Sequence, residues 1–62
     1  MKIFSVEDAK KKKLVQIIMW QHCDLFEWVK AEHDRMQSVN KKREVMIVER
    51  RGRYAVFANK LA

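Results

Sequence analysis

The sequence has few of the residues that interrupt or cross-link a chain. Its 62 residues include no proline, one glycine and one cysteine. The single Cys23 excludes an internal disulfide, and no CxxC or HExxH motif indicates a zinc site. The apolar runs, such as Ile17 to Trp20, are far shorter than the roughly 20 residues of a membrane-spanning helix. We therefore predict no metal, no cofactor and no membrane partner.

The remaining composition favours a small folded domain. Hydrophobic residues make up 48% of the chain, which argues against disorder. A chain of this length buries only about 60% of its unfolded surface, so we expect a single domain, residues 1–62, that is helped by self-association, with a homodimer as the expected form. No long apolar segment resembles a secretory signal, and a lone thiol fits a reducing compartment, so we place the protein in the cytoplasm.

Positive charge is concentrated at both ends of the chain. Lys and Arg number 14 against 8 acidic residues, which gives a net charge of +6. Residues 1–20 carry a net +3, residues 21–37 a net −2 and residues 38–62 a net +5. A field of this kind attracts nucleic acid or other anionic surfaces, although it also serves solubility alone.

The N-terminal segment predicts a short strand followed by a helix. Residues 2–5 include Ile3 and Phe4, which favour an extended conformation. Ser5, followed three residues later by Asp8, resembles a capping box, so we expect a helix to begin near Val6.

The apolar stretch from Leu14 to Met36 keeps one phase on a helical wheel and leaves two architectures open. A continuous helix from Val6 to about Gln37 would be roughly 48 Å long and would need a dimer or larger partner to cover it. A break at residues 21–23 would give two ordinary helices, because Asp24 followed by Glu27 resembles a second N-cap. We favour the break, although neither glycine nor proline marks it.

The clearest local pattern is a C-terminal β-hairpin. A polar connection at residues 38–42, with Asn40 as a helix-stop residue, precedes two β-prone runs around a three-residue turn that contains Gly52. Both faces of these strands are apolar, so we predict that the hairpin is covered twice, by the helices and by a neighbouring strand or subunit. The last residues, 59–62, are expected to form a short tail. The predicted fold class is α+β, with a short N-terminal extended segment, two helices or one long helix, and a hairpin, winged-helix-like or dimeric.

Basic residues at the helix end, the connection and the hairpin tip are the candidate nucleic-acid contacts. They are Lys10, Lys13, Lys41, Lys42, Arg43, Arg50, Arg51 and Arg53. The tip resembles the wing of a winged-helix domain in composition, and arginine suits phosphate contact or minor-groove insertion. A hairpin tip is also polar simply because it is exposed.

Three apolar residues fall outside the main stripe and are candidate interface residues: Ile17, Trp20 and Trp28. Trp20 alternatively caps the core at the break. Base stacking is the least favoured interpretation, because stacking surfaces combine aromatic with basic residues and the sequence neighbours here are Gln21, Asp24 and Glu27.

No catalytic or metal site is expected. His22 and His33 would lie roughly 16 Å apart on an unbroken helix, too far to share a metal ion. Cys23 next to His22 lacks a base positioned across a site, so we expect no enzyme.

These observations favour a small basic module that binds nucleic acid, DNA more than RNA, as a regulatory or accessory protein. The partner would be the phosphate backbone. The alternative is a protein-interaction module, a small regulator, inhibitor or adaptor, that acts through its aromatic residues and an acidic helix and self-associates.

Overall fold

The computed structural model describes residues 2–60, so Leu61 and Ala62 of the expected tail lie outside the described residues. The chain forms two α-helices, one 3₁₀ turn and a four-stranded mixed sheet, an α+β fold as predicted. The elements in order are β1 (Ile3–Phe4), α1 (Val6–Lys11), β2 (Val15–His22), η1 (Cys23–Leu25), α2 (Phe26–Val39), β3 (Val45–Arg50) and β4 (Arg53–Ala58).

The hairpin forms the centre of the sheet, whose strand order is β1-β3-β4-β2. β1 pairs in parallel with β3, so that Ile3 lies opposite Ile47. β2 pairs antiparallel with β4 on the other side, with two register irregularities along its length. β2 therefore forms one edge of the sheet.

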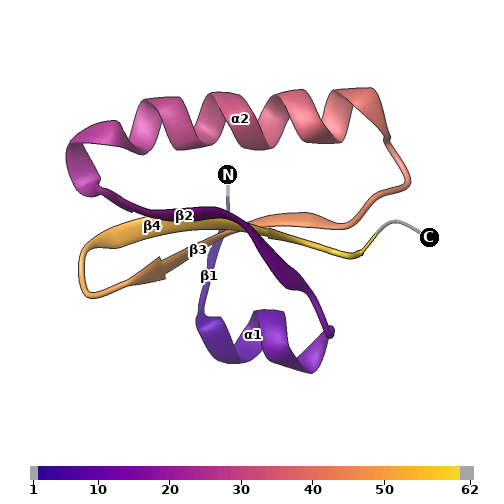
Figure 1. Cartoon of the computed structure of the whole chain (residues 1–62), viewed down its shortest axis with the longest axis horizontal. Helices are drawn as coiled ribbons and strands as arrows, with labels where there is room; N and C mark the ends of the chain where they lie inside the picture. Colours follow the sequence, from indigo (N-terminus) through magenta and orange to yellow (C-terminus); the bar gives the residue numbers. More distant parts are fainter. Residues whose placement is uncertain (1, 61–62) are drawn as a thin grey trace.

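One helix covers each face of the sheet, and α1 and α2 lie on opposite sides of it in Figure 1. The core beneath α1 contains Ala9, Leu14, Met46, Val48, Ala55 and Phe57. The core beneath α2 contains Val29, Val45, Ile47, Val56 and Ala58. The prediction that both hairpin faces are covered is confirmed, but the expected cover by a neighbouring strand or subunit is wrong, because a helix of the same chain covers each face. We call these two sides of the sheet the α1 face and the α2 face.

Helix α1 begins and ends as its sequence dictates. The Ser5 backbone N–H donates to Asp8 Oδ2 at 3.0 Å and the Asp8 N–H donates to Ser5 Oγ at 3.3 Å, which confirms the capping box. At the other end Lys13 N–H donates to the Lys10 carbonyl and Leu14 N–H to the Ala9 carbonyl. This pattern is a Schellman motif, in which Lys13 takes the left-handed position (φ 57°) and Leu14 enters the core beside Ala9.

The expectation that residues 15–22 belong to a helix is wrong, because they form the eight-residue strand β2. The single helix from Val6 to Gln37 is therefore excluded, and the first helix is six residues long. Val15, Ile17 and Ile18 are β-branched and favour a strand, whereas a short apolar run fits a helical wheel and a buried strand equally well. The prediction of two helices is correct in number.

The second helix starts close to the predicted break, at Phe26, but its N-cap residue is Leu25 and no side chain caps it, so the predicted Asp24 cap is wrong. The His22 side chain, rather than that of Asp24, accepts a backbone hydrogen bond at the start of η1. At the far end Asn40 is the C-cap of α2, as expected.

The hairpin turn contains two residues rather than three, because Arg50 pairs directly with Arg53. Arg51 (φ 50°) and Gly52 (φ 76°) both lie in the left-handed region, which is the pattern of a type I′ turn. The Gly52 N–H donates to Glu49 Oε2 at 3.1 Å and so fixes the turn. None of the helices within residues 2–60 has the length and apolar character required to cross a membrane.

Candidate nucleic-acid interface

Strand alternation places two arginines of the hairpin tip on the α1 face. Met46 and Val48 of β3 pack in the α1-side core, so Arg50 points to the same side. Ala55 and Phe57 of β4 pack there as well, which places Arg53 on this side too. Arg51 lies at the turn itself, so the tip directs its positive charge towards the α1 face and the end of the hairpin.

The lysines that end α1 continue the positive charge on this face. Lys10, Lys11, Lys12 and Lys13 are all exposed. Lys12 Nζ lies 2.5 Å from Glu44 Oε1, just before β3, and does not form an i,i+4 pair with Asp8. The pair with Glu44 brings the end of α1 next to the connection that carries Lys41, Lys42 and Arg43.

That connection is held in place by side-chain hydrogen bonds. Gln37 Nε2 donates to the carbonyls of Asn40, Lys41 and Arg43, at 3.4, 3.3 and 2.8 Å. Asn40 Oδ1 accepts from the Lys42 N–H at 3.1 Å. The backbone is therefore ordered while Lys41 and Lys42 remain exposed, which lowers the entropy cost of binding an anion there.

The α2 face has the opposite charge. Helix α2 carries Glu27, Glu32 and Asp34, and Glu49 of β3 points to the same side by strand alternation. Arg35 forms an ion pair with Glu32, and Lys30 lies on the same helix, so α2 carries a net charge of only −1. The excess of positive charge therefore lies outside α2, and phosphate is attracted more weakly to this helix.

Trp20 lies on the α1 face beside basic and aromatic side chains. Its ring centroid is 6.1 Å from that of Phe57, and the Arg50 guanidinium carbon lies 4.8 Å above its ring. Trp20 is partly buried against the α1-side core, in agreement with the interpretation of Trp20 as a core residue. The sequence disfavours base stacking on Trp20 because acidic residues follow it in the chain. In space, however, the neighbours of Trp20 are Arg50 and Phe57, so this objection does not hold.

The three candidate interface residues do not share one surface. Ile17 lies on the edge strand β2 and is 38% exposed, whereas Trp28 lies on α2 and is 46% exposed. Trp20 belongs to the α1 face. The eight candidate phosphate contacts are also spread along the molecule. In Figure 1 the connection between α2 and β3, which carries Lys41, Lys42 and Arg43, and the turn between β3 and β4 lie at opposite ends of the long axis.

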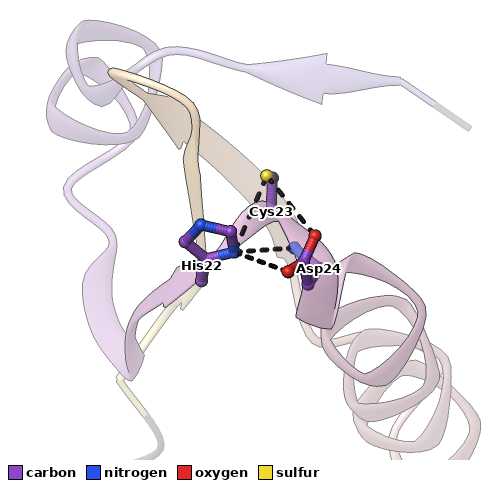
Figure 2. Close-up of side chains that lie close together, drawn as sticks. All are labelled: His22, Cys23 and Asp24. Carbon is purple, nitrogen blue, oxygen red and sulfur yellow. Dashed lines mark hydrogen bonds and ion pairs between the residues drawn. The ribbon is translucent and has the colours of Figure 1, made fainter.

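A cluster of potential metal ligands at the end of β2 was not predicted from the sequence. Figure 2 shows the side chains of His22, Cys23 and Asp24 directed towards one another, with their ligand atoms within 4.8 Å. Cys23 Sγ is 3.7 Å from His22 Nδ1 and 4.0 Å from Asp24 Oδ1. A break between two helices was favoured here, whereas the structure has the end of β2 at His22 followed by η1 from Cys23, where the three side chains converge.

The hydrogen bonds within this cluster account for the convergence of its three side chains, so no metal ion is needed to explain their arrangement. The Asp24 backbone N–H donates to His22 Nδ1 at 3.2 Å. Because a backbone N–H can only donate, Nδ1 must be the acceptor, and its 3.3 Å approach to Asp24 Oδ2 is not an ion pair at the same time. A metal ion at Nδ1 would have to break this cap, so we assign His22 to capping η1.

A shallow hollow lies beside the ordered connection. Its volume is about 350 Å³, and it is lined by Arg35, Met36, Val39, Asn40 and Arg43. Arg43 Nε donates to the Asn59 carbonyl at 3.2 Å, which anchors the rim to the end of β4. Its two guanidinium groups already have partners, because that of Arg35 pairs with Glu32.

Comparisons with models of protein families, with curated proteins and with solved structures found no match to this chain.

Proposed function

We propose that the protein binds nucleic acid through its α1 face, with the phosphate backbone as the principal contact. The observation that supports this most is the separation of charge between the two faces. On the α1 face Lys10 to Lys13, Arg50 and Arg53 outnumber the acids Glu7, Asp8 and Glu44, whereas α2 carries three acids and two bases. If the positive charge served solubility alone, its unequal distribution between the two faces would have no explanation.

The proposed contact runs from the ordered connection and the end of α1 to the hairpin tip. The tip serves as a wing that reaches phosphate or a minor groove through Arg51, because this residue lies at the turn. Affinity of this kind depends on salt and carries little sequence readout, because phosphate contacts position a protein without reading bases. A regulatory or accessory role with DNA as the main target is consistent with such binding.

A salt titration tests this proposal. Binding to duplex DNA, single-stranded DNA and RNA of equal length is measured at several salt concentrations. A Lys41→Ala, Lys42→Ala double variant should lower the slope of log K against log salt by up to about 0.9 for each duplex phosphate that is no longer neutralised.

The control is Lys30→Ala, which removes one positive charge from α2, against two in the double variant, so the effects are compared per charge removed. It should leave the slope nearly unchanged. No binding to any of the three nucleic acids at low salt would overturn the proposal, and equal effects of Lys30 and Lys41 would remove the role of the α1 face.

Self-association is a second candidate function, and the exposed edge strand favours it. β2 carries no Asp, Glu, Lys or Arg, although charge is a common protection for an edge. Val15, Ile17 and Met19 on it are 42, 38 and 64% exposed. The two register irregularities disturb further strand pairing, so we propose that side chains rather than the backbone join two copies.

Sedimentation measurements test this candidate. A dimer at micromolar concentration should dissociate when Met19 is changed to Lys, because charge on both copies would meet at the contact. Trp28→Phe on α2 is the control and should not alter assembly. A monomer at every concentration would exclude this surface.

A further inference from the structure

The part of the α1 face near the hairpin tip combines an aromatic ring with two arginines. Helix α1 is only six residues long, about 9 Å, and cannot cover the whole length of the sheet beneath it. Trp20 occupies this face next to Phe57, with Arg50 above its ring.

We propose that this area binds an unpaired base of a single-stranded nucleic acid, by stacking on the exposed Arg50 guanidinium that lies over the partly buried Trp20 ring. This inference rests on the proposed function and names its target class. Bases stack on aromatic rings and on arginine guanidinium planes, and such stacking tolerates any base. A duplex keeps its bases stacked on one another and offers none for this contact.

The surrounding charges favour a strand that continues from this point. Arg53 lies on the same face and Arg51 at the adjoining turn, so phosphates on either side of the stacked base meet positive charge. Lys10 and Lys13 lie further along the same face and extend the track. Glu49, the acid nearest the tip in sequence, does not oppose this charge, since it points to the α2 face and accepts from the Gly52 N–H.

The two tryptophans provide an internal comparison. Trp20 lies on the α1 face and Trp28 on α2, so each can be observed alone. In a Trp28→Phe variant all tryptophan fluorescence comes from Trp20, and in a Trp20→Phe variant it comes from Trp28. We expect an oligo(dT) of about 12 nucleotides, within the site size of small single-strand binders, to quench Trp20 on binding and to leave Trp28 unaffected. Oligo(U) should give the same result, because the base face and not the sugar is recognised.

Affinity measurements complete the test. Trp20→Leu should weaken binding of oligo(dT) roughly 5- to 150-fold, the range expected for one stacked base, while binding of a duplex of equal length weakens much less. Arg50→Lys retains the charge but removes the planar guanidinium, so it should also weaken single-strand binding more than duplex binding. Circular dichroism checks that each variant is folded. The quenching experiment does not use Trp20→Leu, so it tests the proposal even if that variant does not fold.

The outcomes separate this inference from the proposed function. Binding of oligo(dT) without quenching of Trp20, or tighter binding of the duplex than of the single strand, would overturn the stacking site and leave phosphate binding intact. No binding of either nucleic acid would overturn both.

Discussion

Lys13 and Arg51 share a left-handed backbone conformation, with φ values of 57° and 50°, although 38 positions separate them in the chain. Within residues 2–60 no other non-glycine residue has a positive φ. Lys13 lies at the Schellman position, where glycine is preferred, and Arg51 at the first position of a type I′ turn, where asparagine, aspartate or glycine is preferred. Both residues are candidate phosphate contacts. Backbone strain kept at a basic residue is consistent with a functional demand for its charge.

Replacement of Lys13 by glycine should stabilise the fold while weakening binding. Glycine relieves a left-handed strain of about 1 kcal/mol, so we expect the free energy of unfolding to rise by up to about that amount. The removal of one charge should lower the salt slope for a duplex by up to about 0.9. Urea unfolding and salt-titrated binding measure the two effects. A lower stability would contradict the Schellman assignment, and unchanged binding would show that Lys13 contacts no phosphate.

Replacement of Arg51 by asparagine should act in the same direction at the other end of the molecule. Asn-Gly is the most favourable pair for a type I′ turn, so the hairpin should gain a few tenths to about 1 kcal/mol. Thermal unfolding measures this gain, and oligonucleotide binding should become weaker. Arg51→Val serves as the opposite control, because a β-branched residue fits the left-handed region poorly and should destabilise the turn.

Acid should weaken the start of α1 through Asp8. The pKa of its carboxyl group is held below its ordinary value, first by the Ser5 backbone hydrogen bond and then by the Ser5 side chain. Because the folded-state pKa is lowered, this stabilisation is present above the ordinary carboxyl pKa and is lost as pH falls through the folded value. Asp8→Asn should therefore show a smaller loss of stability between neutral and acidic pH than the unaltered chain. Equal pH profiles from denaturant titrations would contradict the role of this cap.

Gln37 should affect binding without carrying any charge. Gln37→Ala removes the donor to three carbonyls of the connection, so we expect a stability loss of about 0.5–1.5 kcal/mol. The freed connection should also bind nucleic acid more weakly, because Lys41 and Lys42 lose their ordered backbone. Gln37→Glu places a carboxylate against the same carbonyls and should be worse in both assays. Full affinity in Gln37→Ala would show that the order of the connection is irrelevant to binding.

The parts of the fold that depend on local signals could be predicted from the sequence. Ser5 and Asp8 mark the start of α1 because their side chains satisfy backbone groups only three residues away. The hairpin and its Gly52 were found for the same reason. β2 was missed because its apolar run fits either periodicity, and only pairing with β4, more than 30 residues later, decides the conformation.

The candidate site was predicted residue by residue but not as a surface. The basic residues could be named from charge alone, whereas their division between faces depends on strand alternation in a sheet whose pairing was unknown. The contact of Arg50 with Trp20 joins β3 to β2 across β4. It could not be predicted, because no local sequence pattern indicates which strands are neighbours in the sheet. The same applies to the ion pair of Lys12 and Glu44, which are 32 positions apart.

The strand order also fixes when the protein can fold during its synthesis. β1 and β2 lie on either side of the hairpin, so the elements translated first have no strand to pair with until residues 45–58 have left the ribosome. Contacts of such long sequence separation form slowly, because the closure of long loops must precede them. Until then the apolar side chains of β2 lack their partner strand β4 and remain exposed to solvent.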